Sequence, residues 1–160
     1  MKKLLIAAVI MFAAISFSCK KNDANCCIPP YQPFTTAEKN GAKWDAAVSA
    51  SKFKGDSVAI VGAQTEERLI MQIKFNGKGL YNLTGNQALF FTTVGQDVIT
   101  SFYNVDNSTV STLEITDYNN AKGTITGTYY VALKKEPNRY VGAPETIRFL
   151  KGRFTTYLKN

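Results

Sequence analysis

Short stretches of alternating apolar and polar residues recur along most of the chain. The clearest covers residues 68–75, RLIMQIKF, where every second residue is apolar: Leu69, Met71, Ile73 and Phe75. A period of two places alternate side chains on one face of an extended chain, so this stretch predicts a β-strand with one buried face. Similar patterns occupy residues 34–44, 44–53, 57–63, 80–84, 87–94, 98–105, 110–118, 124–133 and 145–158.

Turn residues separate these stretches. Asn40-Gly41 and Asn76-Gly77 suit the positive-φ positions of a tight turn, so the strands on either side of each are predicted to form a hairpin. Gly152 interrupts the last pattern, which predicts a bulge or a second hairpin. The longest predicted loop is residues 134–145. The segment TTAEKN, residues 35–40, is a poor candidate for even a short helix.

About nine or ten strands follow one another at intervals of roughly 8 to 12 residues, which is typical of an all-β protein. Short loops between them favour antiparallel pairing of consecutive strands. We therefore predict one all-β domain over residues 34–160: an antiparallel β-sandwich or a β-barrel-like fold, largely a meander. The total of 160 residues suits one domain rather than two.

The first eighteen residues are predicted to lie outside this domain. MKK is a short basic segment, and LLIAAVIMFAAISF is an apolar run that is short for a membrane span. This order of segments is typical of a secretory signal peptide.

The end of that signal, SFSCKK, resembles the lipobox of bacterial lipoproteins, with Ser18 before Cys19; Phe17 departs from the common pattern. The resemblance implies cleavage before Cys19, thioether attachment of diacylglycerol to its sulfur, and acylation of its new amino group, for instance with palmitate. Two or more acyl chains hold a protein on a bilayer durably. Because Lys20, and not Asp, follows the cysteine, the resemblance implies the outer membrane; the periplasmic and the surface-facing side are both left open.

Residues 19–33 are predicted to form the lipidated cysteine and a flexible tether, polar at first and then rich in proline. Cys26 and Cys27 lie within it. In an oxidising compartment they could form a vicinal disulfide, pair with another chain or stay free. A metal site is not expected, because neither a CxxC spacing nor any histidine is present.

The later segments FTTAEKNGAKW, ITDYNNAKGTITGTYY and ETIRFLKGRF resemble a group of small Bacteroidetes outer-membrane lipoproteins of unknown function with a β-rich domain. Apolar and glycine positions carry this resemblance, so it implies a fold and an anchor and names no catalytic residue.

The composition argues against common enzyme chemistries. The chain has no histidine, which excludes Ser-His-Asp and Cys-His nucleophilic sites and His-ligated metals. The adjacent acids Glu66 and Glu67 lie in a predicted turn, where charged side chains are usually solvated. A two-carboxylate site would have to draw on acids at mostly loop positions: Asp97, Asp106, Glu114 and Asp117. We expect no catalytic residue, cofactor or metal.

The aromatic residues offer few signs of a ligand. Trp44, the sole tryptophan, is expected in the core. Of Tyr129 and Tyr130, one ring is expected to face solvent, where three other tyrosines could join it: Tyr81, Tyr103 and Tyr118. The net charge of +7 is spread along the chain without an arginine cluster, so nucleic acid is not an expected partner.

The leading functional hypothesis is a non-catalytic lipoprotein, held on the outer membrane through acylated Cys19, whose β domain binds a glycan, a small apolar ligand or an envelope protein. One alternative is a carrier similar to calycin barrels, with an apolar cavity lined by Phe90, Phe102 or Met71. A less favoured alternative is a carbohydrate-active enzyme with two facing carboxylates.

Overall fold

A computed structural model describes residues 33–137, 140 and 142–159. The signal peptide and all three cysteines lie outside the described residues. Within them, no helix is long and apolar enough to cross a membrane. The described residues form ten strands and one short 3-10 turn, η1 (Gly85–Gln87): β1 (Phe34–Lys39), β2 (Ala42–Phe53), β3 (Ser57–Ala63), β4 (Glu67–Lys74), β5 (Gly79–Leu83), β6 (Ala88–Val94), β7 (Val98–Val105), β8 (Ser111–Asn119), β9 (Thr124–Lys135) and β10 (Thr146–Lys159).

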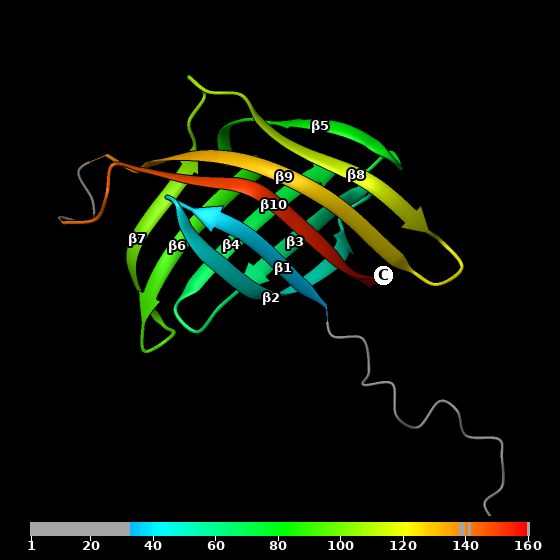
Figure 1. The fold of residues 1–160 in the computed structure, drawn as a ribbon, viewed down its shortest axis with the longest axis horizontal. Helices are drawn as coiled ribbons and strands as arrows, with labels where there is room; N and C mark the ends of the chain where they lie inside the picture. The colour runs from blue at the N-terminus through cyan, green and yellow to red at the C-terminus, as the bar shows by residue number, and fades with distance from the viewer. Residues whose placement is uncertain (1–32, 138–139, 141, 160) are drawn as a thin grey trace, which may run out of the picture. The chain divides into compact units, whose positions relative to one another are not determined.

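The ten strands belong to one sheet that closes on itself (Figure 1). Its order is β1-β10-β2-β3-β4-β6-β7-β9-β8-β5, and β9 also pairs with β10. Strands β2, β3, β4, β6, β7, β9 and β10 therefore form a closed ring, to which β1 adds by pairing with both β10 and β2. The all-β, largely antiparallel prediction is confirmed. Of the two architectures that the sequence left open, the barrel-like one is observed.

One long strand makes this closure. The residues of β9 near its end, Leu133–Lys135, pair with β7, whereas Thr124–Tyr130 pair along the same edge with β8. Strand β8 carries β5 on its other side, so these two strands extend the sheet beyond the ring. The short contact between β10 and β2, at Leu158 and Lys159, is the parallel exception among the described pairings.

Of the two hairpins predicted at Asn-Gly turns, one is confirmed and the other is wrong. Asn40 and Gly41 have φ of 49° and 84° and join the antiparallel pair β1–β2, as predicted. The predicted hairpin at Asn76-Gly77 is wrong: β4 pairs with β6, and β5 pairs with β8. The reason is the small apolar surface of β5, in which Leu83 is buried but Leu80 is 65% exposed.

Two other local expectations are settled by the strands. The weak helical candidate at residues 35–40 belongs to β1 and its turn. Gly152 lies within an unbroken β10, at a register shift between Phe149 and Gly152, so the bulge is correct and the second hairpin is not.

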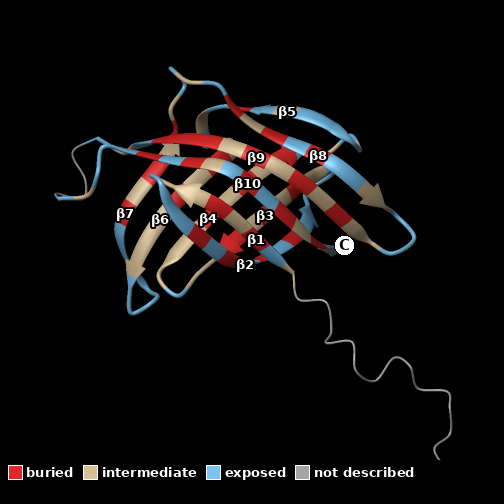
Figure 2. Cartoon of the chain, in the orientation of Figure 1, coloured by how far each residue is buried: buried red, intermediate tan, exposed pale blue. Residues whose placement is uncertain are grey.

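The core fills the inside of the ring with alternate residues of each strand, visible as alternating buried and exposed bands in Figure 2. Trp44 is 2% exposed, which confirms its predicted place in the core, and its ring meets that of Phe149 edge to face at 5.0 Å. Phe90 packs against both Phe149 and Tyr103. These aromatic rings thus fill the middle of the barrel interior.

Candidate functional site

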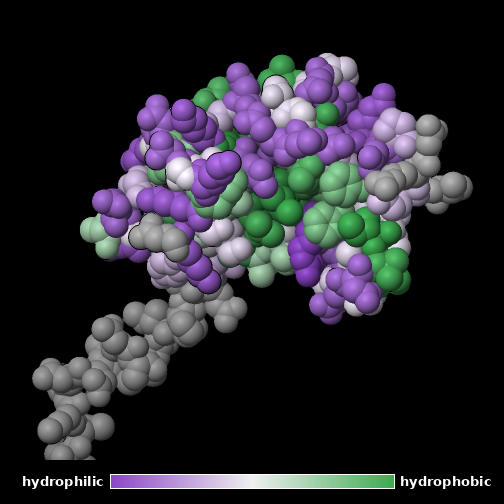
Figure 3. All heavy atoms as spheres, turned by 180° about the vertical axis from the view of Figure 1, so that it is seen from behind, coloured by the Kyte–Doolittle hydropathy of each residue, from purple (hydrophilic) through white to green (hydrophobic). Residues whose placement is uncertain are grey.

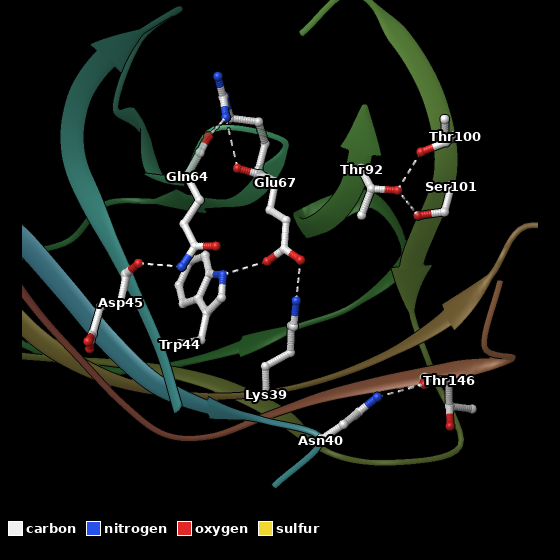
Figure 4. Close-up of polar contacts among 11 residues, drawn as sticks. Lys39, Asn40, Trp44, Asp45, Gln64, Glu67, Thr92, Thr100, Ser101 and Thr146 are labelled. Carbon is white, nitrogen blue, oxygen red and sulfur yellow. Dashed lines mark hydrogen bonds and ion pairs between the residues drawn. The ribbon is translucent and has the colours of Figure 1, made fainter. Parts of the chain in front are cut away.

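Charged side chains point into one end of the barrel, where an apolar interior would be expected (Figure 4). The indole Nε1–H of Trp44 donates a hydrogen bond of 2.7 Å to Oε2 of Glu67. Lys39 Nζ donates to the other carboxylate oxygen, Oε1, and forms an ion pair with it. The side chains of Lys39 and Glu67 are only 25% and 21% exposed. Both carboxylate oxygens of Glu67 are therefore held in place.

Three hydroxyl groups lie on the facing strands. Thr92 Oγ1 on β6 is 2.8 Å from Thr100 Oγ1 and 2.5 Å from Ser101 Oγ, both on β7. Nearby, the hydroxyl of Tyr103 donates to the carbonyl of Pro144 at 2.9 Å, and burial raises the pKa of this tyrosine. Ser101 also forms a side-chain hydrogen bond with the Tyr103 hydroxyl, so the three hydroxyl protons can all be used within the cluster, while several oxygen lone pairs stay available to another molecule.

These groups surround a pocket of about 330 Å³ at the barrel mouth. Ala143 and Pro144, shortly before β10, line one side of it. Lys135 Nζ donates a hydrogen bond to the carbonyl of Ala143, and Glu136 N–H donates to the carbonyl of Phe102. Lys39 Nζ also lies 5.5 Å from the centre of the Phe90 ring. The pocket is lined by Lys39, Asn40, Glu67, Phe90, Thr92, Thr100, Ser101, Tyr103, Ala143, Pro144 and Ile147.

Four of the polar mouth residues each extend an inward-facing row of their own strand. Glu67 precedes the inward row of Leu69, Met71 and Ile73, and Thr92 follows Ala88 and Phe90. The same holds for Lys39 on β1 and for Ser101 on β7. The sequence interpretation missed these residues. The signal that could have found them is a polar residue at the next inward position beyond an apolar row.

Of the predicted acidic residues, only Glu67 lines this mouth among the described residues. The interpretation of Glu67 as a solvated turn residue is wrong, because it is half-buried and bonded to Trp44 and Lys39. Glu66 accepts a hydrogen bond of 2.6 Å from Thr93 Oγ1. With Asp45, these two acids line a separate surface hollow of about 770 Å³ beside Phe34.

The other four candidate acids are dispersed. Asp97 lies in the β6–β7 turn, and Glu114 is exposed on β8. Asp106 accepts hydrogen bonds from the hydroxyl and backbone N–H of Ser108, which lower its pKa. A hydrogen bond and ion pair with Lys78 lower the pKa of Asp117. Among the described residues, no group of three or more acidic, histidine or cysteine side chains could hold a metal ion.

The aromatic candidates are also separated. Tyr103 is fully buried, so the expectation that it shares a surface with Tyr81 and Tyr118 is wrong. Tyr129 points inward and is 4% exposed, whereas Tyr130 is partly exposed, as expected for neighbours on a strand.

Comparison with known proteins adds a family but no activity. Neither the curated proteins nor the solved structures include a match to this chain. Residues 31–156 match the model of a family described as a domain of unknown function, DUF6252. Because this match covers most of the 160 residues, the chain belongs to the DUF6252 family.

Proposed function

We propose that this protein is a lipid-anchored, non-catalytic binding protein whose barrel mouth holds a small polar ligand. The observation that carries the proposal is the group of polar side chains around the mouth pocket. Lys39 and Glu67 neutralise each other there, and hydroxyls with unused hydrogen-bonding capacity face them. A neutral ligand that both donates and accepts hydrogen bonds, such as a monosaccharide, matches this lining better than an ion does.

The position and size of the pocket support a ligand of this kind. Barrel mouths are common binding sites, and about 330 Å³ lies at the small end of the usual range for ligand pockets. The carrier alternative fits the interior less well. Phe90 and Met71 are packed in the core, while Phe102 lies on the outer surface against Phe91.

The acids of the separate hollow support a binding role over acid–base catalysis. Asp45 is ion-paired with Lys43, and Glu66 and Glu67 accept the hydrogen bonds described above. A glycosidase needs one carboxyl group free to donate a proton and another placed opposite it. Each of these three carboxylates instead has a donor or cation as its partner.

Binding can be measured with the intrinsic fluorescence of Trp44, the sole tryptophan, because its indole is bonded to Glu67 at the pocket. The full chain in mild detergent is titrated with a panel of monosaccharides, N-acetylated amino sugars and free amino acids. We expect at least one saturating change, weakened about tenfold or more by the double substitution Thr92→Val and Ser101→Ala.

The matched control is Ser49→Ala, which removes an exposed hydroxyl from the outer surface of β2. This control should bind like the unaltered chain. Equal affinity in the mouth variant and the control, or no saturation with any compound, would refute the mouth as the binding site.

The anchor is supported by the sequence around Cys19 alone and is tested separately. Cys19→Ala should move the protein from the membrane fraction to the soluble fraction and abolish labelling with a palmitate analogue. A Cys26→Ala variant is the control and should stay on the membrane. Unchanged partitioning of the Cys19 variant would overturn the lipidation proposal without affecting the binding site.

A further inference from the structure

The outer surface of four neighbouring strands carries apolar side chains where a sheet facing water normally carries polar ones. Val61, Ile70 and Leu89 lie side by side in the register of β3, β4 and β6. Next to them, Phe91 and Phe102 are cross-strand partners whose rings stack at 6.3 Å. All five side chains are partly exposed. We call these five residues the apolar face.

The apolar face is confined to one side of the barrel. Figure 3, which views the molecule from behind, shows apolar surface gathered in the middle of this side with hydrophilic surface around it. The β6–β7 hairpin continues it with three exposed residues, Val94, Val98 and Ile99. On β2, by contrast, the outward residues Ser49 and Ser51 are polar, and the other exposed apolar side chains of the described residues, such as Leu80 on β5, are scattered. The largest group of neighbouring apolar side chains on the outer surface therefore lies on β3, β4, β6 and β7.

We propose that the apolar face is the interface of a symmetric dimer with a second copy of this chain. The charge pattern along β4 and the residue just before it favours a second copy of this chain as the partner. The outward positions of β4, counted from the centre at Ile70, are Gln72 and Lys74 in one direction and Arg68 in the other. Glu66 lies two residues before Arg68, in the bend that precedes β4, and its carboxylate accepts a hydrogen bond from Thr93 on β6. Consider a two-fold axis that lies between the two faces at Ile70 and runs perpendicular to β4. It places each residue before Ile70 in one copy over the residue equally far after Ile70 in the other copy.

This symmetry pairs opposite charges. Lys74 of each copy lies over the other copy's Glu66, and Arg68 lies over Gln72. Val61, Ile70 and Leu89 of the two faces then meet in the middle, as in the aligned packing of two sheets. Phe91 and Phe102 lie level with Arg68 and extend the apolar contact toward the Glu66 end. Glu66 is already held beside the face by Thr93, which donates to its carboxylate at 2.6 Å. A lipid surface would meet one acidic and one basic end and would leave Glu66 without a cation.

The size of the face predicts a weak dimer. Four strands about 4.8 Å apart and roughly six residues long cover on the order of 400 Å² per copy. Stable interfaces bury about 800 Å² per partner, whereas weak, transient ones bury less than about 600 Å² per partner. The exposed hairpin adds to this area. We therefore expect dissociation in the micromolar range, which two-dimensional confinement on a membrane would favour further.

Sedimentation equilibrium of the full chain in mild detergent, from about 1 to 100 μM, tests the interface. We expect a monomer–dimer equilibrium, with the dissociation constant raised at least about tenfold by Ile70→Lys. Ser49→Lys, which adds the same charge outside the apolar face, is the control and should change little. Circular dichroism and melting temperature verify that both variants fold.

Charge reversal gives a second test that does not depend on the apolar side chains. Lys74→Glu and Glu66→Lys should each weaken the dimer several-fold, and the double variant should restore it. A chain that stays monomeric at all concentrations would overturn the proposal. So would a dimer that is indifferent to Ile70→Lys. Binding of a monomeric Cys19→Ala chain to phosphatidylglycerol vesicles, lost when Ile70→Lys is added, would also overturn the proposal and assign the face to lipid.

Discussion

Gly152 in β10 is predicted to be intolerant of any side chain, even a methyl group. It is the cross-strand partner of Tyr129 on β9, and the tyrosine ring lies directly against its backbone. A Cβ at position 152 would lie 2.3 Å from the nearest ring carbon, where ordinary contacts are 3.4 to 4 Å. Gly152 does not have a left-handed φ, so the cost of Gly152→Ala comes from this contact and not from backbone strain.

The size of the effect follows from the hydrogen bond that a displaced Tyr129 ring would lose and from the overpacking around it. The Thr35 hydroxyl donates to the carbonyl of Arg153, so the 2.8 Å hydrogen bond between Thr35 and Tyr129 is donated by the tyrosine. A ring displaced by about 1 Å loses this buried bond, at about 1 kcal/mol. Overpacking adds about 1–3 kcal/mol. We expect Gly152→Ala to lower the free energy of unfolding by about 2–4 kcal/mol.

Urea unfolding followed by circular dichroism measures this change in the unaltered chain and in a Tyr129→Ala background. Tyr129→Ala is itself destabilising by about 3–5 kcal/mol because it leaves a cavity. In that background the ring is gone, so adding Gly152→Ala should cost less than about 0.5 kcal/mol. The same cost in both backgrounds would refute the steric explanation.

Two further predictions concern Tyr129 and the mouth. Burial raises the pKa of Tyr129 to about 12, so its contribution to stability is fully present below the unfolded pKa of about 10 and is lost as pH rises toward 12. Between pH 8 and 11.5 the free energy of unfolding, measured with urea, should fall by about 2 kcal/mol more in the unaltered chain than in the Tyr129→Phe variant. An equal fall in both would contradict this. At the mouth, Glu67→Gln leaves Lys39 without its carboxylate in a half-buried place and should cost about 1–3 kcal/mol. In a double-mutant cycle with Lys39→Met, a coupling of about 1 kcal/mol is expected, and additivity within about 0.3 kcal/mol would show that the ion pair is not stabilising.

Much of the fold could be predicted because its signals are local. Period-two alternation places Leu69, Met71 and Ile73 on the inner face of β4, as the structure has them. The Asn40-Gly41 hairpin depends on the φ of two adjacent residues, which the sequence indicates directly. Trp44 was expected in the core because large aromatic side chains are rarely left in water.

Strand pairing was less predictable, because it is decided by competition across the whole sheet. Asn76-Gly77 is a good turn, yet β4 pairs with the more apolar β6 and leaves β5 to β8. Barrel closure likewise depends on β9, which is long enough to pair with β7 and β8 along one edge and with β10 along the other.

By itself, the sequence determined the strand content and which residues of a strand share a face. It also determined the lipoprotein-like segment around Cys19. Only the tertiary structure decided that Lys39, Glu67, Thr92 and Ser101 meet at one mouth, and that five apolar residues share one outer face. The physical reason is that alternation specifies which way a side chain points from its own strand. Which side chains it meets depends on the order and register of strands that are distant in the chain.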